Sequence, residues 1–246
     1  MTPSHVSRYL FHDREILLKY TDGVMMPSAF SKFLAAHLPK PHDNAKAALD
    51  LGSGSGIQGI ILAKLGWPEV FAVDIDKRCL AATEFNALLN QVSEYSVGAK
   101  QRVVAVHSDK FERIYGLKFD LIVSNPPTLP ATGETPPFAS GGPTGREFLD
   151  SMIEHSSDAL NPGGRLIFVQ SSLANIEQTR TLLRDKGFSV SISGRKRFPF
   201  RDFYMPHLFF YRRQAMLSRK AIYHENKDGM LYETLYIIDA QINVAH

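Results

Sequence analysis

The sequence Asp50-Leu51-Gly52-Ser53-Gly54-Ser55-Gly56 follows a short apolar run and precedes a segment with helical periodicity. Glycines at such a junction let the backbone come close to a ligand, because no side chain stands in the way. Gly54, Gly56 and Gly59 also fit the dinucleotide pattern G-x-G-x-x-G, and Asp74 lies at a suitable distance to bind a ribose hydroxyl. The loop therefore predicts a nucleotide-type cofactor, either a dinucleotide or S-adenosylmethionine (SAM).

Around this loop, short apolar runs alternate with helical patterns, which is typical of a parallel sheet built from βαβ units. We expect strands near residues 46–51, 70–74, 102–106, 119–124, 165–170 and 188–195. We expect helices over residues 56–65, 77–90, 146–160 and 172–186. Residues 231–240 follow an Asp228-Gly229 turn signal and predict a seventh strand. The predicted fold is α/β and Rossmann-like, a seven-stranded, mostly parallel sheet with an antiparallel last strand and helices on both faces.

Two further segments flank or interrupt this alternation. Pro27-Ser28, followed by Phe30 and Phe33 at helical spacing, predicts a helix before the first strand. We therefore divide the chain into an N-terminal helical appendage, residues 1–45, and a cofactor-binding domain, residues 46–246. Within that domain, residues 196–229 form a basic, aromatic insertion that leaves the sheet at the edge where α/β folds bind ligands.

The acid at Asp50 favours SAM over a dinucleotide. An acid two residues before the first glycine can hold an ammonium group, whereas it would repel a pyrophosphate. SAM carries an amino-acid tail and no pyrophosphate. Farther along, Asp74 ends a predicted strand and is followed by Ile75, a pair suited to a ribose diol and an adenine face, which either cofactor would accept.

The sequence Ser124-Asn125-Pro126-Pro127-Thr128 directly follows a predicted strand and has no use in a dehydrogenase. The chain thus carries Asp-x-Gly-x-Gly-x-Gly, then the ribose-side acid, then Asn-Pro-Pro after the fourth strand. This order resembles class I SAM-dependent methyltransferases of the Asn-Pro-Pro-Tyr group, most closely the HemK-type release-factor glutamine methyltransferases and related small-domain methyltransferases. The resemblance covers about residues 20–195.

The resemblance implies SAM as cofactor and S-adenosyl-L-homocysteine as product. It implies these cofactor-binding residues: Asp50, Gly52, Ser53, Gly54 and Gly56 for the methionine part, Asp74 for the ribose, Ile75 for the adenine face, Ser108 and Asp109 for the adenine amine, and Asn125 beside the methyl group. The residues alone also allow Asp109 to be a turn-capping acid, and Ser53 and Ser55 to be simple loop residues.

The predicted catalytic residues are Asn125, Pro126 and Pro127. An amide or amino nitrogen has a delocalised lone pair, so a group must hold its N–H bonds in place for attack on a methyl sulfonium. The side-chain oxygen of Asn125 and the carbonyl of Pro126 can each accept such a hydrogen bond, while consecutive prolines keep the backbone rigid. Alignment of this kind can contribute on the order of 7 to 11 kcal/mol without a general base.

The chain departs from the HemK-type pattern in three places. Thr128 stands where that family has an aromatic residue, and Tyr20, Phe30, Phe138 or an aromatic of the insertion are candidates to replace it. The segment before the first strand is too short for the usual helical release-factor-recognition domain, and the insertion is extra. Residues 141–150 nevertheless resemble the glycine-rich loop and helix start of the glutamine methyltransferases, although their glycines would also suit a hinge.

Basic and aromatic residues are concentrated between Arg195 and Lys220. Eight basic residues and one acid give this segment a charge of +7, against +3 for the whole chain. Interleaved Phe and Tyr side chains are typical of surfaces that contact phosphates and stack on bases. The same residues would equally anchor a helix on the core or dock an acidic protein.

Composition excludes several classes of site. The single cysteine, Cys79, excludes intramolecular disulfides and multi-cysteine metal sites. The nine histidines include no pair at ligand spacing on one helix, so we expect no metal. We see no signal peptide and no apolar run of membrane-spanning length, and therefore expect no membrane association and a cytoplasmic location.

The sequence predicts a SAM-dependent N-methyltransferase, of EC 2.1.1 type, that acts on a planar amide or amino nitrogen. We expect a protein substrate and a glutamine side chain as acceptor. An exocyclic amine of an RNA or DNA base, bound through Arg195 to Lys220, and a small metabolite are the alternatives. A SAM-binding regulatory module without turnover is the non-enzymatic alternative. The sequence leaves the acceptor, the number of methyl groups transferred, the oligomeric state and the need for a partner open.

Overall fold

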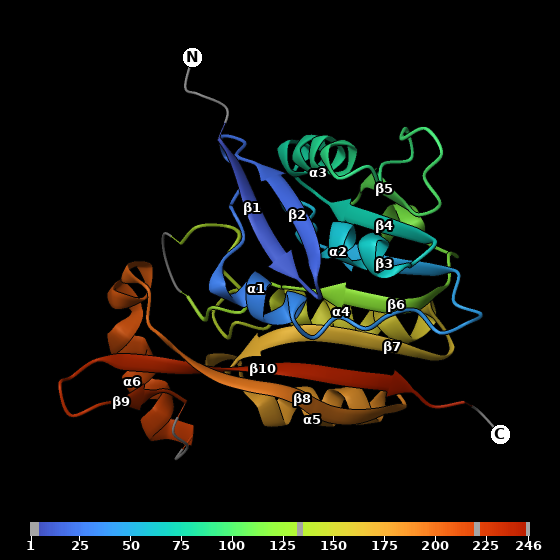
Figure 1. The fold of residues 1–246 in the computed structure, drawn as a ribbon. Coiled ribbons are helices and arrows are strands. Elements are labelled where there is room, and N and C mark those ends of the chain that lie inside the picture. Colours follow the sequence, from blue (N-terminus) through green and yellow to red (C-terminus); the bar gives the residue numbers. More distant parts are fainter. Residues whose placement is uncertain (1–4, 132–134, 219–221, 245–246) are drawn as a thin grey trace.

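The computed structural model describes residues 5–131, 135–218 and 222–244. Among them, one sheet has the strand order β5-β4-β3-β6-β7-β10-β8 (Figure 1). Its strands are β5 (Arg102–His107), β4 (Glu69–Asp74), β3 (Ala47–Leu51), β6 (Phe119–Ser124), β7 (Leu160–Ser171), β10 (Leu231–Ile242) and β8 (Phe188–Pro199). The first five are parallel, and β10 pairs antiparallel with both β7 and β8. The predicted sheet is confirmed, with the two-residue β9 (His224–Glu225) added beside β10.

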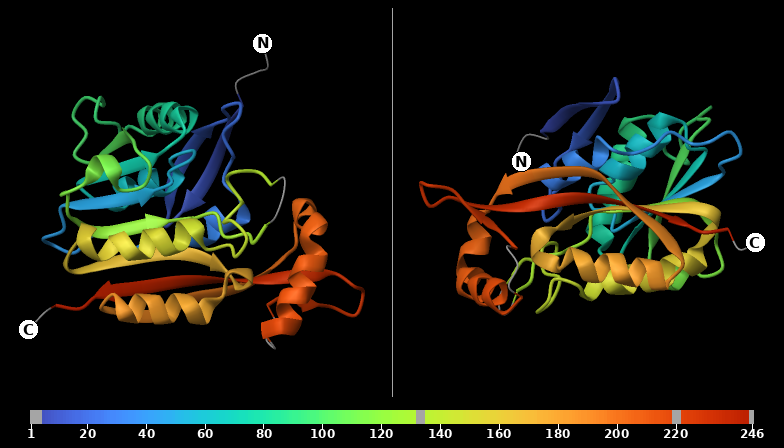
Figure 2. Two further views of the ribbon diagram at one scale, coloured as in Figure 1. Left: turned by 180° about the vertical axis from the view of Figure 1, so that it is seen from behind. Right: turned by 90° about the horizontal axis from the view of Figure 1, so that it is seen from below.

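Helices cover both faces of this sheet, as predicted (Figure 2). One face carries α1 (Ala29–Ala35), α2 (Ile57–Leu65) and α3 (Lys77–Leu89), and the other carries α4 (Glu147–Ala159) and α5 (Ile176–Asp185). Each face has its own hydrophobic core, with Leu34 and Ile60 fully buried in the first and Met152 and Leu183 in the second. No helix in the described ranges is long and apolar enough to cross a membrane.

The N-terminal segment corrects the prediction of a helical appendage over residues 1–45. The predicted helix is present as α1, and the Ser28 side chain caps it by accepting hydrogen bonds from the amides of Phe30 and Ser31. Before it, however, β1 (Val6–Phe11) and β2 (Arg14–Lys19) form an antiparallel hairpin. Its two turn residues, His12 and Asp13, both have positive φ, which hairpin turns require. The chain has no Asn-Gly or Asp-Gly at this turn, so the usual sequence signal is absent.

Two buried asparagines, Asn86 of α3 and Asn90 at its C-terminal cap, attach this hairpin to the main fold. Asn90 accepts a hydrogen bond from the Leu17 amide and donates one to the Leu17 carbonyl, so its side chain pairs with β2 as a neighbouring strand would. Asn86 accepts from the Lys19 amide and donates to the carbonyl of Ser55 in the glycine loop. The Asn86 side chain therefore connects the hairpin to the predicted cofactor loop.

The insertion starts later than the predicted residue 196. Strand β8 keeps its pairing with β10 as far as Pro199, so Arg195, Lys196 and Arg197 lie on the edge strand of the sheet. Cationic side chains on an edge strand disfavour pairing with another sheet. The rest of the insertion contains η3 (Asp202–His207), α6 (Leu208–Ser218) and β9. Helix α6 lies beyond one end of the sheet, while β9 pairs with the start of β10 (Figure 1). Part of this region, residues 219–221, lies outside the described residues.

Replacing Asn90 with alanine should loosen the hairpin. The change leaves the backbone N–H and C=O of Leu17 without their partners, which we expect to lower the free energy of unfolding by about 1–3 kcal/mol. Chemical denaturation and hydrogen exchange of the Leu17 amide measure the two effects. Glu84→Ala, at an exposed position of the same helix, is the matched control. Unchanged exchange at Leu17 in the Asn90 variant would contradict this attachment.

Candidate functional site

The predicted site residues lie at one edge of the sheet. Strand β3 pairs in parallel with β4 on one side and with β6 on the other. The carboxyl ends of these strands therefore meet, bringing the glycine loop after β3, Asp74 at the end of β4 and Asn125 after β6 to the same place. Open α/β sheets bind ligands at this kind of edge.

The glycine loop adopts a backbone that side chains would strain. Gly52, Gly54 and Gly56 all have positive φ, at 79°, 56° and 81°. The amides of Gly52 and Ser53 donate to the Val73 carbonyl at 2.8 and 2.9 Å, which ties the loop to β4. Apart from Gly54 and its two neighbours in the chain, no heavy atom of the described residues lies within 4 Å of the place where a Cβ of Gly54 would stand. The loop is thus rigidly held on one side and open on the other.

Asp50 is a buried carboxylate with one oxygen in use and one free. Its Oδ2 accepts a hydrogen bond from the Gly59 amide at 2.8 Å, at the start of α2. Among the described residues, its Oδ1 is buried without a hydrogen-bond partner. Burial raises the pKa of Asp50 to about 7, an effect that the Gly59 hydrogen bond opposes and the charge of Asp74 reinforces. A buried acid with an unpaired oxygen is complementary to a cationic group.

Asp74 and Ile75 lie beside the glycine loop. Asp74 accepts hydrogen bonds from the Gly54 amide through Oδ2 and from the Asp76 amide through Oδ1, both at 2.9 Å. Ile75 follows directly and is 63% exposed, although the strand before it is mostly buried. An acid next to an exposed apolar side chain offers one polar and one apolar surface to a ligand at this edge.

The predicted adenine-side residues have local partners. Ser108 is buried, and its Oγ accepts a hydrogen bond from the Arg113 amide of the short helix η1 (Glu112–Ile114) at 2.9 Å. The carboxylate of Asp109 lies 2.8 Å from the Lys110 ammonium. The Ser108 amide donates to the Asp74 carbonyl, which places the pair near the end of β4.

The loop serines are held by α3. The hydroxyls of Ser53 and Thr83 lie 3.3 Å apart, and Thr83 also donates to the Gly54 carbonyl. Ser55 accepts at its carbonyl from Asn86. A Cβ at Gly56 would stand 3.0 Å from Thr83, which is a second reason for glycine at that position. These contacts give Ser53 and Ser55 a structural role in fixing the loop.

Asn125 is oriented by a residue of α1 that the sequence analysis did not identify. Its Nδ2 donates a hydrogen bond to the Ser31 hydroxyl at 3.1 Å. Ser31 is buried on the first turn of α1, beside the capping residue Ser28. With the nitrogen directed to Ser31, Oδ1 is the side-chain atom of Asn125 that can accept a hydrogen bond from a ligand. No local sequence signal links these two residues, which are 94 positions apart.

A small cleft adjoins Asn125 and Thr128, and several aromatic side chains line it. Besides Asn125, Pro126 and Pro127, it is lined by Phe30, Phe138, Arg201 and Tyr204. Of the candidates to replace the missing aromatic residue, Phe30, Phe138 and the insertion residue Tyr204 line this cleft, whereas Tyr20 does not. Thr128 lines it as well and is almost fully buried.

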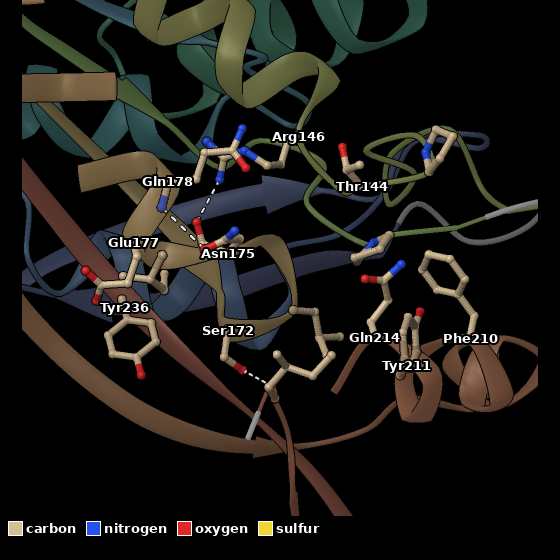
Figure 3. A pocket seen from close by; sticks show the side chains of 15 residues that line it. Thr144, Arg146, Ser172, Asn175, Glu177, Gln178, Phe210, Tyr211, Gln214 and Tyr236 are labelled. Carbon is tan, nitrogen blue, oxygen red and sulfur yellow. Dashed lines mark hydrogen bonds between the residues drawn. The ribbon is translucent and has the colours of Figure 1, made fainter. Parts of the chain in front are cut away.

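A second cavity of about 560 Å³ is lined by Pro130, in the loop that follows Asn125, and by residues of the insertion (Figure 3). The start of α5, the loop before α4 and helix α6 form its walls. Arg146 lines it but is engaged with Asp150, Thr179 and the carbonyl of Ala174. Its preceding residue, Gly145, has positive φ, and a Cβ there would meet the Thr128 carbonyl at 2.6 Å. The glycine-rich segment therefore packs tightly against the Asn125 loop, which argues against a free hinge.

Within the described residues, no group of three His, Cys, Asp or Glu side chains is arranged to hold a metal ion. The polar groups at this edge are instead a loop of backbone amides, two acids and one oriented amide oxygen. They can bind a cation, hydroxyl groups and N–H donors.

Comparison with known proteins points the same way. The family model of the methyltransferase small domain matches residues 28–191. A protein of Methanocaldococcus jannaschii, provisionally named as a protein N5-glutamine methyltransferase, is 36% identical over 194 residues, covering 76% of this chain and 92% of the relative. The release factor glutamine methyltransferase of Geobacter sulfurreducens is 29% identical over 180 residues, covering 68% of this chain and 60% of that protein. The chain thus spans less than two thirds of the latter enzyme.

A solved structure shares the fold. The 16S rRNA N2 G1207 methyltransferase of T. thermophilus, in complex with AdoMet and guanosine, superimposes with a TM-score of 0.56 at 17% identity. The match covers 97% of this chain and 50% of that one. Because the family match spans the strands that carry both the glycine loop and Asn125, the chain belongs to the methyltransferase small domain family and is a methyltransferase.

Proposed function

We propose that the chain transfers a methyl group from SAM to the side-chain nitrogen of a protein glutamine. The observation that carries the proposal is the orientation of Asn125, whose nitrogen is bound to Ser31 and whose oxygen is left to accept an N–H. The two relatives named as glutamine methyltransferases support the same acceptor.

The residues at the sheet edge fit SAM. The free oxygen of Asp50 suits the ammonium group of its methionine part, and Gly54 leaves open space beside the loop. Asp74 and Ile75 suit the ribose and the adenine face. Ser108 and Asp109 enter the proposal only through their position near β4, because their side chains have other partners. When bound, SAM would supply an electrophilic methyl group on a sulfonium.

The chain's own residues would act on the acceptor by holding it in line. Asn125 Oδ1 and the Pro126 carbonyl would each accept a hydrogen bond from one N–H group of the glutamine side-chain amide, and Pro127 would keep the turn rigid. With SAM bound, the nitrogen would form its bond to the methyl carbon as the carbon–sulfur bond breaks, S-adenosyl-L-homocysteine would be the leaving group, and the nitrogen would lose one proton to water during or after the transfer. No side chain has to remove that proton beforehand.

A nucleic-acid acceptor is the second candidate, and one observation favours it. Arg195, Arg197, Arg212 and Arg213 are all exposed, and none of them has an ion-pair partner among the described residues. Such cations could bind phosphates, which would make transfer fall steeply with salt concentration. Arg195 and Arg197 lie on the edge strand β8, where cationic side chains also serve to prevent pairing with another sheet, so their exposure does not require a nucleic acid.

Labelled methyl from SAM, added to a cell lysate, should appear in the protein fraction and on a glutamine. Asn125→Ala should abolish this transfer and leave the affinity for SAM nearly unchanged, because the amide holds the acceptor. Mass spectrometry of the labelled peptides identifies the residue. Label in RNA or DNA would favour the second candidate, label only in small molecules would contradict both, and full transfer by Asn125→Ala would show that the site is elsewhere.

Ser31→Ala should slow transfer without affecting cofactor binding. The change removes the hydroxyl that orients Asn125, a neutral hydrogen bond worth about 0.5–1.5 kcal/mol, so we expect kcat to fall about two- to twelvefold. Steady-state kinetics and SAM titration separate the two effects. Ser156→Ala is the matched control, because this serine is equally buried but bonds only within α4. Equal effects of both changes on kcat would contradict a positioning role for Ser31.

The affinity for SAM should rise with pH near neutrality. Burial raises the pKa of Asp50 to about 7, and only the ionised carboxylate attracts an ammonium group. Ionisation of Asp50 increases about tenfold between about pH 6 and about pH 8, so the association constant should increase by a similar factor and level off above that range. Asp50→Asn should bind more weakly and lack this rise. Ionisation of SAM itself affects both proteins alike, so identical pH profiles would rule out the proposed contact.

A further inference from the structure

Arg201 places a cation at the cleft in which the acceptor would lie. It follows β8 at the start of the insertion and lines the same cleft as Asn125 and Pro126. Helix α1 supports both sides of this cleft, because the Arg201 guanidinium lies over the Phe30 ring, 4.4 Å from its centroid, and the next residue, Ser31, binds Asn125. The guanidinium and the Asn125 amide are therefore fixed relative to each other by two adjacent residues.

The Arg201 side chain is held in place by aromatic and buried polar contacts. Its guanidinium also lies 4.7 Å from the centroid of the Phe203 ring, and its Nη2 donates a hydrogen bond to the Tyr204 hydroxyl at 3.2 Å. Tyr204 in turn donates to the fully buried carboxyl of Glu233 at 2.7 Å. Such a network restricts the rotamers of a long side chain, which makes it a suitable group for recognition.

Most hydrogen-bonding capacity of this guanidinium is unused. Arginine has five N–H donors, and within the described residues only the bond to Tyr204 is present. Its Nε is buried without a partner, and no carboxylate of the described residues lies within ion-pair distance of it. The nearest acid in this network, Glu233, is reached only through the Tyr204 hydroxyl. A guanidinium without a direct ion pair, beside a cleft, is suited to bind an oxygen atom of a ligand.

We propose that Arg201 determines which side chain is methylated by donating a hydrogen bond to the carbonyl oxygen of the substrate amide. Asn125 and Pro126 accept hydrogen bonds from the two N–H groups of the same amide. A primary amide has two N–H donors and one carbonyl acceptor, and the cleft offers the opposite set. This inference rests on the proposed glutamine acceptor and adds the group that recognises its oxygen.

The same arrangement disfavours the two charged side chains of similar length. A lysine ammonium would face the Arg201 cation, which repels it. A glutamate carboxylate would be attracted by Arg201, but its oxygens would face Asn125 Oδ1 and the Pro126 carbonyl without a hydrogen atom between them. Only the neutral amide satisfies all three partners, so selection acts through repulsion as well as attraction.

The test compares Arg201→Gln and Arg201→Lys with the wild-type protein. Each is given saturating SAM and increasing amounts of lysate protein, and methylated glutamine is quantified by mass spectrometry. Both variants should lower kcat/KM for the acceptor about ten- to hundredfold, because a hydrogen bond from a charged donor is lost or misplaced. Affinity for SAM and the melting temperature should stay near the wild-type values. Arg184→Gln, an exposed arginine on α5, removes the same charge far from the cleft and should leave transfer unchanged.

The outcomes separate the two proposals. If the wild-type protein methylates no glutamine, the proposed function fails and the role of Arg201 fails with it. If the wild-type protein methylates glutamine and both Arg201 variants match it, the proposed function stands and the Arg201 inference is overturned. If both variants lose SAM binding or unfold, Arg201 only supports the structure, which also overturns the inference.

Discussion

The parallel pairing of β3 with β4 and β6 is the constraint on which the site depends. Residues that are far apart in the chain, Asp50, Asp74 and Asn125, follow or end these strands and so meet at one sheet edge. The Val73 carbonyl accepts hydrogen bonds from two backbone amides of the glycine loop, which fixes the distance between the loop and Asp74. Without this register, the free oxygen of Asp50 and the Asn125 amide would not belong to one site.

Much of this sheet could be predicted from the sequence, because its signals are local. Buried parallel strands are continuous apolar runs, and the loops after them carry glycine, proline or acids at fixed offsets. The strands from Ala47 to Ile242 lie close to their predicted positions. Two strands extend well beyond the predicted runs. β7 begins at Leu160, which pairs with Phe119 of β6, and β8 continues to Pro199 because its pairing with β10 runs on through polar residues.

The features that could not be predicted depend on contacts between distant segments. The hairpin of residues 6–19 is stabilised by Asn90 at the C-terminal cap of α3, whose side chain bonds the backbone of Leu17 as an adjacent strand would. No pattern within the hairpin sequence reveals this partner. Ser31 is an ordinary helical serine until the fold places it beside Asn125. In the sequence, nothing distinguishes Arg201 from the other basic residues between Arg195 and Lys220. The structure separates it from them, because aromatic rings surround it whereas Arg212 and Arg213 are exposed.

One turn of α1 contacts two segments of the acceptor cleft, through Phe30 to Arg201 and through Ser31 to Asn125. The helix lies in the appendage and Arg201 in the insertion, two parts of the chain that are outside the parallel core. Neither can change independently during evolution, since a new side chain at position 30 alters the support of the guanidinium. Divergence in the one should therefore be accompanied by divergence in the other, so that the core is inherited unchanged while these two segments evolve as a pair.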